Sequence, residues 1–136
     1  MTSEEARRRF ASARVARLAT VRPDGTPHLV PVTFALLDAT VYSVVDAKPK
    51  RTGELQRLEN VRANPRAALL VDHYEEEWRY LWWVRADGTA RILEPEEPEA
   101  RRAVAALRER YPQQRAAGPV LAVEVERWIG WSAGGP

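Results

Sequence analysis

The sequence predicts a mainly β fold, in which one antiparallel barrel domain spans residues 1–136 and carries two to three helices. Six or seven short segments alternate apolar and polar residues, which is the spacing of half-buried strands. Turn sequences separate several of these segments, so neighbouring strands are expected to run antiparallel. The chain shows neither a strand–helix–strand rhythm nor a glycine-rich nucleotide fingerprint, which argues against a doubly wound nucleotide fold.

The first element is a predicted helix over residues 2–13, because Ala6, Phe10 and Ala13 fall on one helical face. Residues 15–21 follow with the period-2 alternation of a strand. The chain therefore enters the sheet directly after a short amphipathic helix.

A β-hairpin comes next, because Arg22-Pro23-Asp24-Gly25 has the composition of a tight turn. Its second strand is predicted over residues 26–37. Pro27 and Pro31 within that strand have no N–H to donate to a ladder, so we expect it to lie at a sheet edge or to be interrupted. A tight turn then leads into a third strand over residues 40–46.

A second helix is predicted to begin at Thr52, its N-cap, and to end before Pro65. Leu55, Leu58 and Val61 recur in it at helical spacing. The second half of the chain alternates again between strands and one further helix. We expect strands at 66–73, 79–85 and 120–126, and the second of these can extend through a turn at 86–88 into residues 89–93. The helix is expected at 96–111. An irregular tail that carries Trp128 and Trp131 follows the last strand.

Three cations crowd the start of the second predicted helix: Lys48, Lys50 and Arg51. A helix N-terminus offers unpaired backbone N–H groups and partial positive charge, which together favour an anion. The cluster therefore predicts a site for a phosphate or carboxylate. An ordinary solvated turn is the alternative, and these residues by themselves leave both interpretations open.

The composition excludes several classes of function. The chain contains no cysteine, so disulfides, thiolate metal sites and a cysteine nucleophile are excluded. Its net charge is +2, but acidic runs at 75–77 and 94–97 would repel nucleic acid, and a polyanion-binding module is the weakest hypothesis. The two histidines, His28 and His73, lie on different predicted strands and make a poor metal site. No signal peptide or membrane span is visible, so we expect a cytoplasmic protein without a membrane partner.

Several segments occur in a recognisable order. They are the hairpin RVARLATVRPDGTPHLVPVTF, the strand TVYSVVDA, the segment KPKRTGELQRLENVRANPRAALLV and a tryptophan-rich strand. This order resembles the flavin/deazaflavin split-barrel superfamily, the group that contains pyridoxamine 5′-phosphate oxidase. Within that group the chain looks most similar to the actinobacterial oxidoreductases that use the deazaflavin coenzyme F-420.

The resemblance covers nearly the whole chain and implies a six-stranded FMN-binding-type split barrel. It also implies a homodimer with two cofactor sites at the interface. The chain departs from the oxidase at its C-terminus, which reads RWIGWSAGGP and lacks the oxidase's basic tail. Oxidation of pyridoxamine phosphate is therefore in doubt.

The resemblance assigns residues to the cofactor site. The cofactor phosphate is expected at Lys48, Lys50, Arg51 and Thr52. The ring is expected to lie along the second and third strands, against Pro31, Val32, Thr33, Ser43 and Val44. Trp82 and Trp83 are adjacent on a strand and must face opposite sides, so only one of them can face a ligand. Aromatic residues of a partner chain would complete the pocket, for which we take Trp83 and Trp131.

The implied activity is transfer of a hydride between coenzyme F-420 and an electron-poor small organic substrate. FMN in the same fold is one alternative, and a non-catalytic protein that binds deazaflavin, flavin or haem is another. We assign no catalytic side chain, because hydride chemistry belongs to the cofactor while the protein orients it and excludes water.

Overall fold

The computed structural model describes residues 1–45, 52–115 and 117–134, with the side chains of residues 52–55 left out of the description. Its helices are α1 (Ser3–Ser12), α2 (Thr52–Ala63) and α3 (Pro98–Arg110), with one 3₁₀ turn, η1 (Trp78–Tyr80). Its strands are β1 (Ala16–Val21), β2 (Pro27–Val32), β3 (Ala35–Leu37), β4 (Thr40–Val44), β5 (Arg66–His73), β6 (Trp82–Leu93) and β7 (Val120–Ser132).

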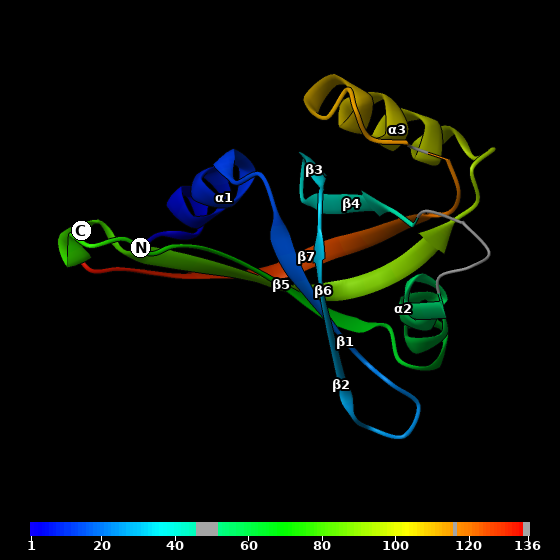
Figure 1. Cartoon of the computed structure of the whole chain (residues 1–136), viewed down its shortest axis with the longest axis horizontal. Coiled ribbons are helices and arrows are strands. Elements are labelled where there is room, and N and C mark those ends of the chain that lie inside the picture. Colours follow the sequence, from blue (N-terminus) through cyan, green and yellow to red (C-terminus); the bar gives the residue numbers. More distant parts are fainter. Residues whose placement is uncertain (46–51, 116, 135–136) are drawn as a thin grey trace.

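The described strands form one antiparallel sheet in the order β2-β1-β5-β6-β7-β4-β3, so β2 and β3 are its two edges. These edges are consecutive in the chain, because only Thr33 and Phe34 separate β2 from β3. Three Cα–Cα steps reach at most about 11 Å, whereas seven strands laid flat would place the edges about 29 Å apart. The sheet must therefore curl until its edges meet, and Figure 1 shows β2 running directly into β3.

The helices cover the curled sheet in two separate layers. Helices α1 and α2 share one core with the strands, in which Phe10 and Leu58 are buried. Helix α3 forms a second core with β3, β4 and β7, centred on Leu107. Strand β4 contributes side chains to both cores, because Val41 lies in the first core and Tyr42 in the second. Within the described residues, no helix has the length and apolarity that crossing a membrane requires.

The sequence pattern predicted most elements correctly. Helix α1, the β1–β2 hairpin and strand β5 lie where helical spacing, turn residues and alternation, respectively, predicted them, and α2 ends before Pro65. The proline-containing strand is both at an edge and interrupted, as expected. That interruption divides it into β2 and β3, which is why the sheet has seven strands where the resemblance implied six.

The predicted turn at residues 86–88 is wrong. Strand β6 runs unbroken from Trp82 to Leu93, and its pairing with β7 only shifts register between Asp87 and Gly88. A Cβ at Gly88 would lie 2.0 Å from the carbonyl oxygen of Glu124. Glycine is therefore needed here for a close approach of two strands, a role that looks like a turn signal in the sequence.

Two further boundaries were wrong. The strand expected from Arg79 begins only at Trp82, because residues 78–80 form η1. The tail expected to be irregular instead continues β7 to Ser132, since it pairs with β6 along its whole length. Trp128 and Trp131 therefore lie on a strand.

One carboxylate ties α3 to the sheet. Tyr42 Oη donates to Glu99 Oε2 at 2.7 Å, and Arg91 donates to both Glu99 oxygens at 2.8 and 2.6 Å. The hydrogen bonds from Arg91, and then that from Tyr42, lower the pKa of Glu99 from 4.5 to about 2. Because the folded pKa lies below the ordinary value, ionised Glu99 stabilises the fold above pH 4.5, and this contribution is lost as the pH falls towards 2.

Glu99→Gln should therefore lower the free energy of unfolding at pH 7, and its deficit relative to wild type should shrink as the pH falls from 4.5 towards 2. Urea denaturation at pH 7, 4.5 and 3 measures this deficit. The matched control is Glu109→Gln, which removes an exposed carboxylate from the same helix. A deficit that is constant over this range would show that ionisation of Glu99 does not hold α3.

Candidate functional site

Five residues that the sequence assigned to the cofactor ring line a single cavity. Pro31 and Val32 end β2, Thr33 follows them, and Ser43 and Val44 end β4. This cavity, here called the edge cavity, measures about 180 Å³, and Arg57 and Gln114 complete its lining. Strands β2 and β4 are far apart in the sheet order, so the curl of the sheet brings these residues together.

Arg57 gives the edge cavity a positive charge that the sequence analysis did not assign. It lies on α2 and is only 7% exposed. A buried guanidinium in a cavity lined by valine and proline favours an anionic or electron-rich ligand edge. Arg57 lies three residues before Asn60, a polar residue on the buried face of α2. Residues three apart share one face of a helix, so this spacing could have indicated from the sequence that Arg57 is buried.

A buried hydrogen-bond pair fixes α2, and with it Arg57, against the sheet. Asn60 is fully buried, and its Nδ2 donates to Thr20 Oγ1 of β1 at 3.0 Å. Its Oδ1 accepts a hydrogen bond from Gln56 Nε2 at 2.8 Å. Satisfied polar groups in a core fix the position of an element more specifically than apolar contacts do.

His28 lies near Arg57 on the neighbouring edge strand. Burial lowers its pKa, and the positive charges of Arg22 and Arg57 lower it further. Its Nδ1 is buried and has no hydrogen-bond partner among the described residues. The ring is therefore neutral near pH 7 and adds no charge beside Arg57.

The predicted phosphate cluster is only partly described. Lys48, Lys50 and Arg51 lie outside the described residues. Helix α2 begins at Thr52, as predicted, and the side chain of Thr52 is also outside the description. The assignment of these four residues to a phosphate stays a prediction.

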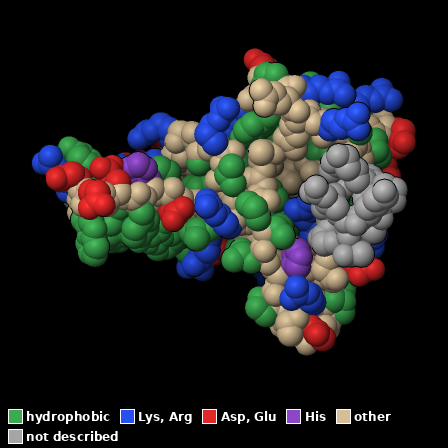
Figure 2. Space-filling model, viewed as in Figure 1, with side chains coloured by type: hydrophobic (Ala, Val, Ile, Leu, Met, Phe, Trp, Pro, Cys, Tyr) green, Lys and Arg blue, Asp and Glu red, His purple; other side chains and the backbone are tan. Residues whose placement is uncertain are grey.

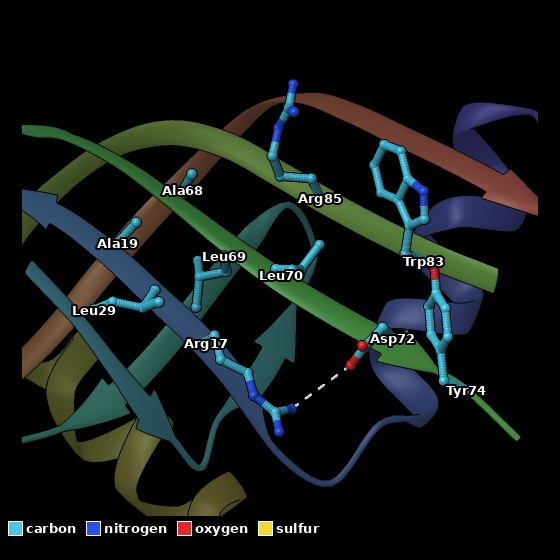
Figure 3. Close-up of a pocket in the computed structure, with 10 residues that line it drawn as sticks. All are labelled: Arg17, Ala19, Leu29, Ala68, Leu69, Leu70, Asp72, Tyr74, Trp83 and Arg85. Atoms are coloured by element: carbon cyan, nitrogen blue, oxygen red, sulfur yellow. Dashed lines mark ion pairs between the residues drawn. The ribbon is translucent and has the colours of Figure 1, made fainter. Parts of the chain in front are cut away.

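Trp83 and Trp131 lie away from the edge cavity. They are directly paired across β6 and β7, so their side chains share one face of the sheet. Trp83 lines a second cavity of about 580 Å³, here called the face cavity, together with Leu29, Leu70 and Tyr74 (Figure 3). Within one chain the structure does not bring these tryptophans to the predicted ring residues, and their role in cofactor binding stays a prediction that needs a second copy.

Apolar side chains dominate the face cavity. Leu29 and Tyr74 are 66% and 64% exposed, and Leu70 and Trp131 are 38% and 44% exposed on the same sheet. Ion pairs mark its rim, one between Arg17 and Asp72 at 3.8 Å and one between Arg85 and Asp87 at 2.7 Å. In Figure 2, hydrophobic side chains also gather on the arm at the left of the molecule, where the β6–β7 ladder ends.

Trp82 lies on the opposite face of the sheet from Trp83, and its contacts show which of the two tryptophans faces the core. It packs against the core that contains α1, with Arg9 lying 5.5 Å from its ring and His73 stacked at 6.3 Å. His73 in turn hydrogen-bonds to Glu75 at 2.7 Å. Trp83 is therefore the tryptophan that faces outward.

A third cavity adjoins the edge cavity. It measures about 720 Å³ and shares Thr33 and Gln114 with the edge cavity. Thr33 Oγ1 donates to Gln114 Oε1 at 2.6 Å, so one hydrogen bond lies at the boundary. We call it the arginine cavity, because its other lining residues are Arg14, Arg110, Tyr111, Pro112 and Gln113.

Over the described ranges, no three His, Asp or Glu side chains are placed to hold a metal ion.

The family model described as pyridoxamine 5′-phosphate oxidase matches residues 2–132. The comparison with curated proteins found no match. Among solved structures, a conserved hypothetical protein of Mycobacterium tuberculosis superposes with a TM-score of 0.78 at 27% identity, covering 98% of this chain and 86% of that one.

Two further solved structures are described by what they bind. An FAD-binding protein of Mesorhizobium loti has a TM-score of 0.73 at 26% identity, covering 96% of this chain and 92% of that one. A haem-binding protein of Mycobacterium smegmatis has a TM-score of 0.72 at 27% identity, covering 98% of this chain but only 54% of that one. The curled sheet thus occurs in proteins that bind large planar cofactors.

Proposed function

The chain belongs to the pyridoxamine 5′-phosphate oxidase family of split barrels, and from that premise we propose that it is an oxidoreductase dependent on the deazaflavin coenzyme F-420. One observation carries the proposal. The five residues expected to contact the coenzyme ring line a single cavity, and a buried arginine lies beside them. These residues come from two segments, the end of β2 with Thr33 after it and the end of β4, which are far apart in the sheet order.

The residues of the edge cavity suit a flavin-like ring. Val32, Val44 and Pro31 offer apolar surface that excludes water. The hydroxyl groups of Thr33 and Ser43 can hydrogen-bond to ring heteroatoms, and Arg57 favours negative charge on the ring. If coenzyme F-420 were held there, it would provide a hydride, with its two electrons, for a carbon of an electron-poor substrate, while a proton from solvent would complete the reduction.

The size of the edge cavity favours a homodimer. Small-molecule sites usually measure about 300–1,000 Å³, whereas the edge cavity provides about 180 Å³. A tricyclic ring would therefore extend beyond it and need a further wall. A second copy could supply that wall, for which the family resemblance assigns Trp83 and Trp131, and the exposed apolar face around Leu70 and Trp83 is a surface that such a copy could cover.

A flavin is the second candidate cofactor, because the FAD-binding protein of Mesorhizobium loti shares 26% identity over nearly its whole length. FMN in the edge cavity would use the same phosphate cluster and the same Arg57. A non-catalytic protein that binds deazaflavin, flavin or haem has similar support in the haem-binding structure. The three possibilities differ in ligand preference and in turnover.

A fluorescence titration of the apoprotein with coenzyme F-420 and with FMN tests the proposal. We expect F-420 to bind with a dissociation constant of about 1 µM or tighter and FMN to bind at least about tenfold more weakly. The reverse preference would assign the protein to the FMN branch. Binding of haem alone would favour the non-catalytic protein and contradict an F-420 oxidoreductase.

Removing cations from the proposed site should weaken coenzyme binding. Lys50→Ala combined with Arg51→Ala should raise the dissociation constant for F-420 by more than about tenfold, because each charge-assisted bond contributes strongly. Arg57→Gln should weaken binding in the same direction by removing charge from the edge cavity. The control is Arg62→Gln, an exposed cation in the last turn of α2. Unchanged affinity in the double variant, with the apoprotein melting as in wild type, would remove the phosphate assignment.

Leu70→Glu should convert the dimer to a monomer, because a carboxylate would be buried at the proposed interface without a partner. Light scattering after size exclusion measures the molar mass. Leu37→Glu is a matched control, since Leu37 is 36% exposed and Leu70 is 38% exposed. A wild-type monomer, or a dimer that tolerates Leu70→Glu, would rule out this interface.

A further inference from the structure

The arginine cavity contains two guanidinium groups from opposite parts of the chain. Arg14 lies between α1 and β1, and Arg110 is the last residue of α3. At about 720 Å³ the cavity falls within the size range of small-molecule sites. It opens beside the edge cavity, with which it shares Thr33 and Gln114.

Arg110 is held in place without a carboxylate. Its Nη1 donates to the carbonyl oxygen of Phe34 at 3.2 Å, and its Nη2 donates to the carbonyl oxygen of Ala13. Its guanidinium also lies 4.8 Å from the ring centre of Phe34. Two of its five N–H groups are engaged in these bonds, so others remain for a ligand.

Arg14 is held by the same aromatic residue as Arg110. Its guanidinium lies 5.2 Å from the ring centre of Tyr111, and Arg110 lies 5.3 Å from the same ring. Tyr111 Oη donates to the carbonyl oxygen of Arg14 at 2.7 Å, which fixes the ring between the two segments. In the part of the chain that the structure describes, neither arginine forms an ion pair with an acidic side chain.

Two neighbouring cations on one aromatic ring repel each other, and an anion between them would offset that repulsion. A planar carboxylate matches the fork of a guanidinium and accepts two parallel hydrogen bonds from it. We infer that the arginine cavity binds a carboxylate group, and that the substrate of the proposed reaction is an unsaturated organic acid. This inference rests on the proposed function for the redox step and on the arginine cavity for the acid.

The position of the cavity explains how such an acid would meet the coenzyme. Hydride transfer requires the reacting atoms to approach within about 3–3.5 Å. An acid whose carboxylate contacts Arg14 and Arg110 can extend its unsaturated carbons past Thr33 and Gln114 to the edge cavity. Thr33 and Gln114 would then determine how long the acid can be.

The test uses benzoate, a planar carboxylate, and benzamide, its neutral counterpart, as probes in calorimetric titrations of the apoprotein. We expect benzoate to bind at least about tenfold more tightly than benzamide. Arg14→Gln should abolish that preference, and it leaves the fold intact because the side chain is exposed and only stacks on Tyr111. Arg108→Gln, an exposed arginine on α3, is the matched control and should retain the preference. Equal affinity for the two probes, or a preference that survives Arg14→Gln, would overturn the inference.

A competition experiment separates two sources of the carboxylate, because the oligoglutamate side chain of F-420 is also acidic. If F-420 displaces benzoate while the deazaflavin lacking that side chain does not, the cavity belongs to the coenzyme and the inferred substrate class is wrong. Simultaneous binding of F-420 and benzoate supports the substrate assignment. Because benzoate is titrated without coenzyme, its binding can succeed even if the F-420 proposal fails.

Discussion

The two-residue connection between β2 and β3 is the constraint on which the rest of the structure depends. It joins the two outer edges of a seven-stranded sheet, so the sheet cannot be flat. The curl places the ends of β2 and β4 together, and the edge cavity forms where they meet. Thr33, one of the two connecting residues, lines both the edge cavity and the arginine cavity. The geometry of the candidate site is thus a direct result of closing the sheet.

The long ladder between β6 and β7 lies at the centre of the sheet, between the two groups of strands that curl towards each other. Strands β5 and β4 pair with it directly, β1 and β3 join it through one neighbour, and β2 joins it through β1 and β5. Gly88 lets the two backbones approach closely where their register shifts. Three helices then fix the site: α2 holds Arg57 through the buried pair Asn60–Thr20, α3 is tied by Glu99 and ends at Arg110, and α1 leads to Arg14.

Local signals in the sequence predicted the fold well, because they depend on near neighbours. Pro27 and Pro31 identified an edge strand, and the Asp24–Gly25 turn identified a hairpin. Gly88 led to the wrong prediction of a turn at residues 86–88, because glycine is required both in tight turns and where two strands approach closely. The ring-contact residues came from the resemblance, and the structure brings five of them to one cavity. Arg57 and the Arg14–Arg110 pair were missed, since their significance depends on contacts between segments up to 97 residues apart.

The two edges of the sheet also limit how the protein can associate. An open edge is a template for adding strands from other chains, which leads to aggregation. Here β2 carries Pro27 and Pro31, which cannot donate such bonds, and β3 is only three residues long. Continuous strand addition is therefore discouraged at both edges. An open-ended fibre built by strand pairing is thus disfavoured, and contacts with other molecules are left to side chains on the outer surface.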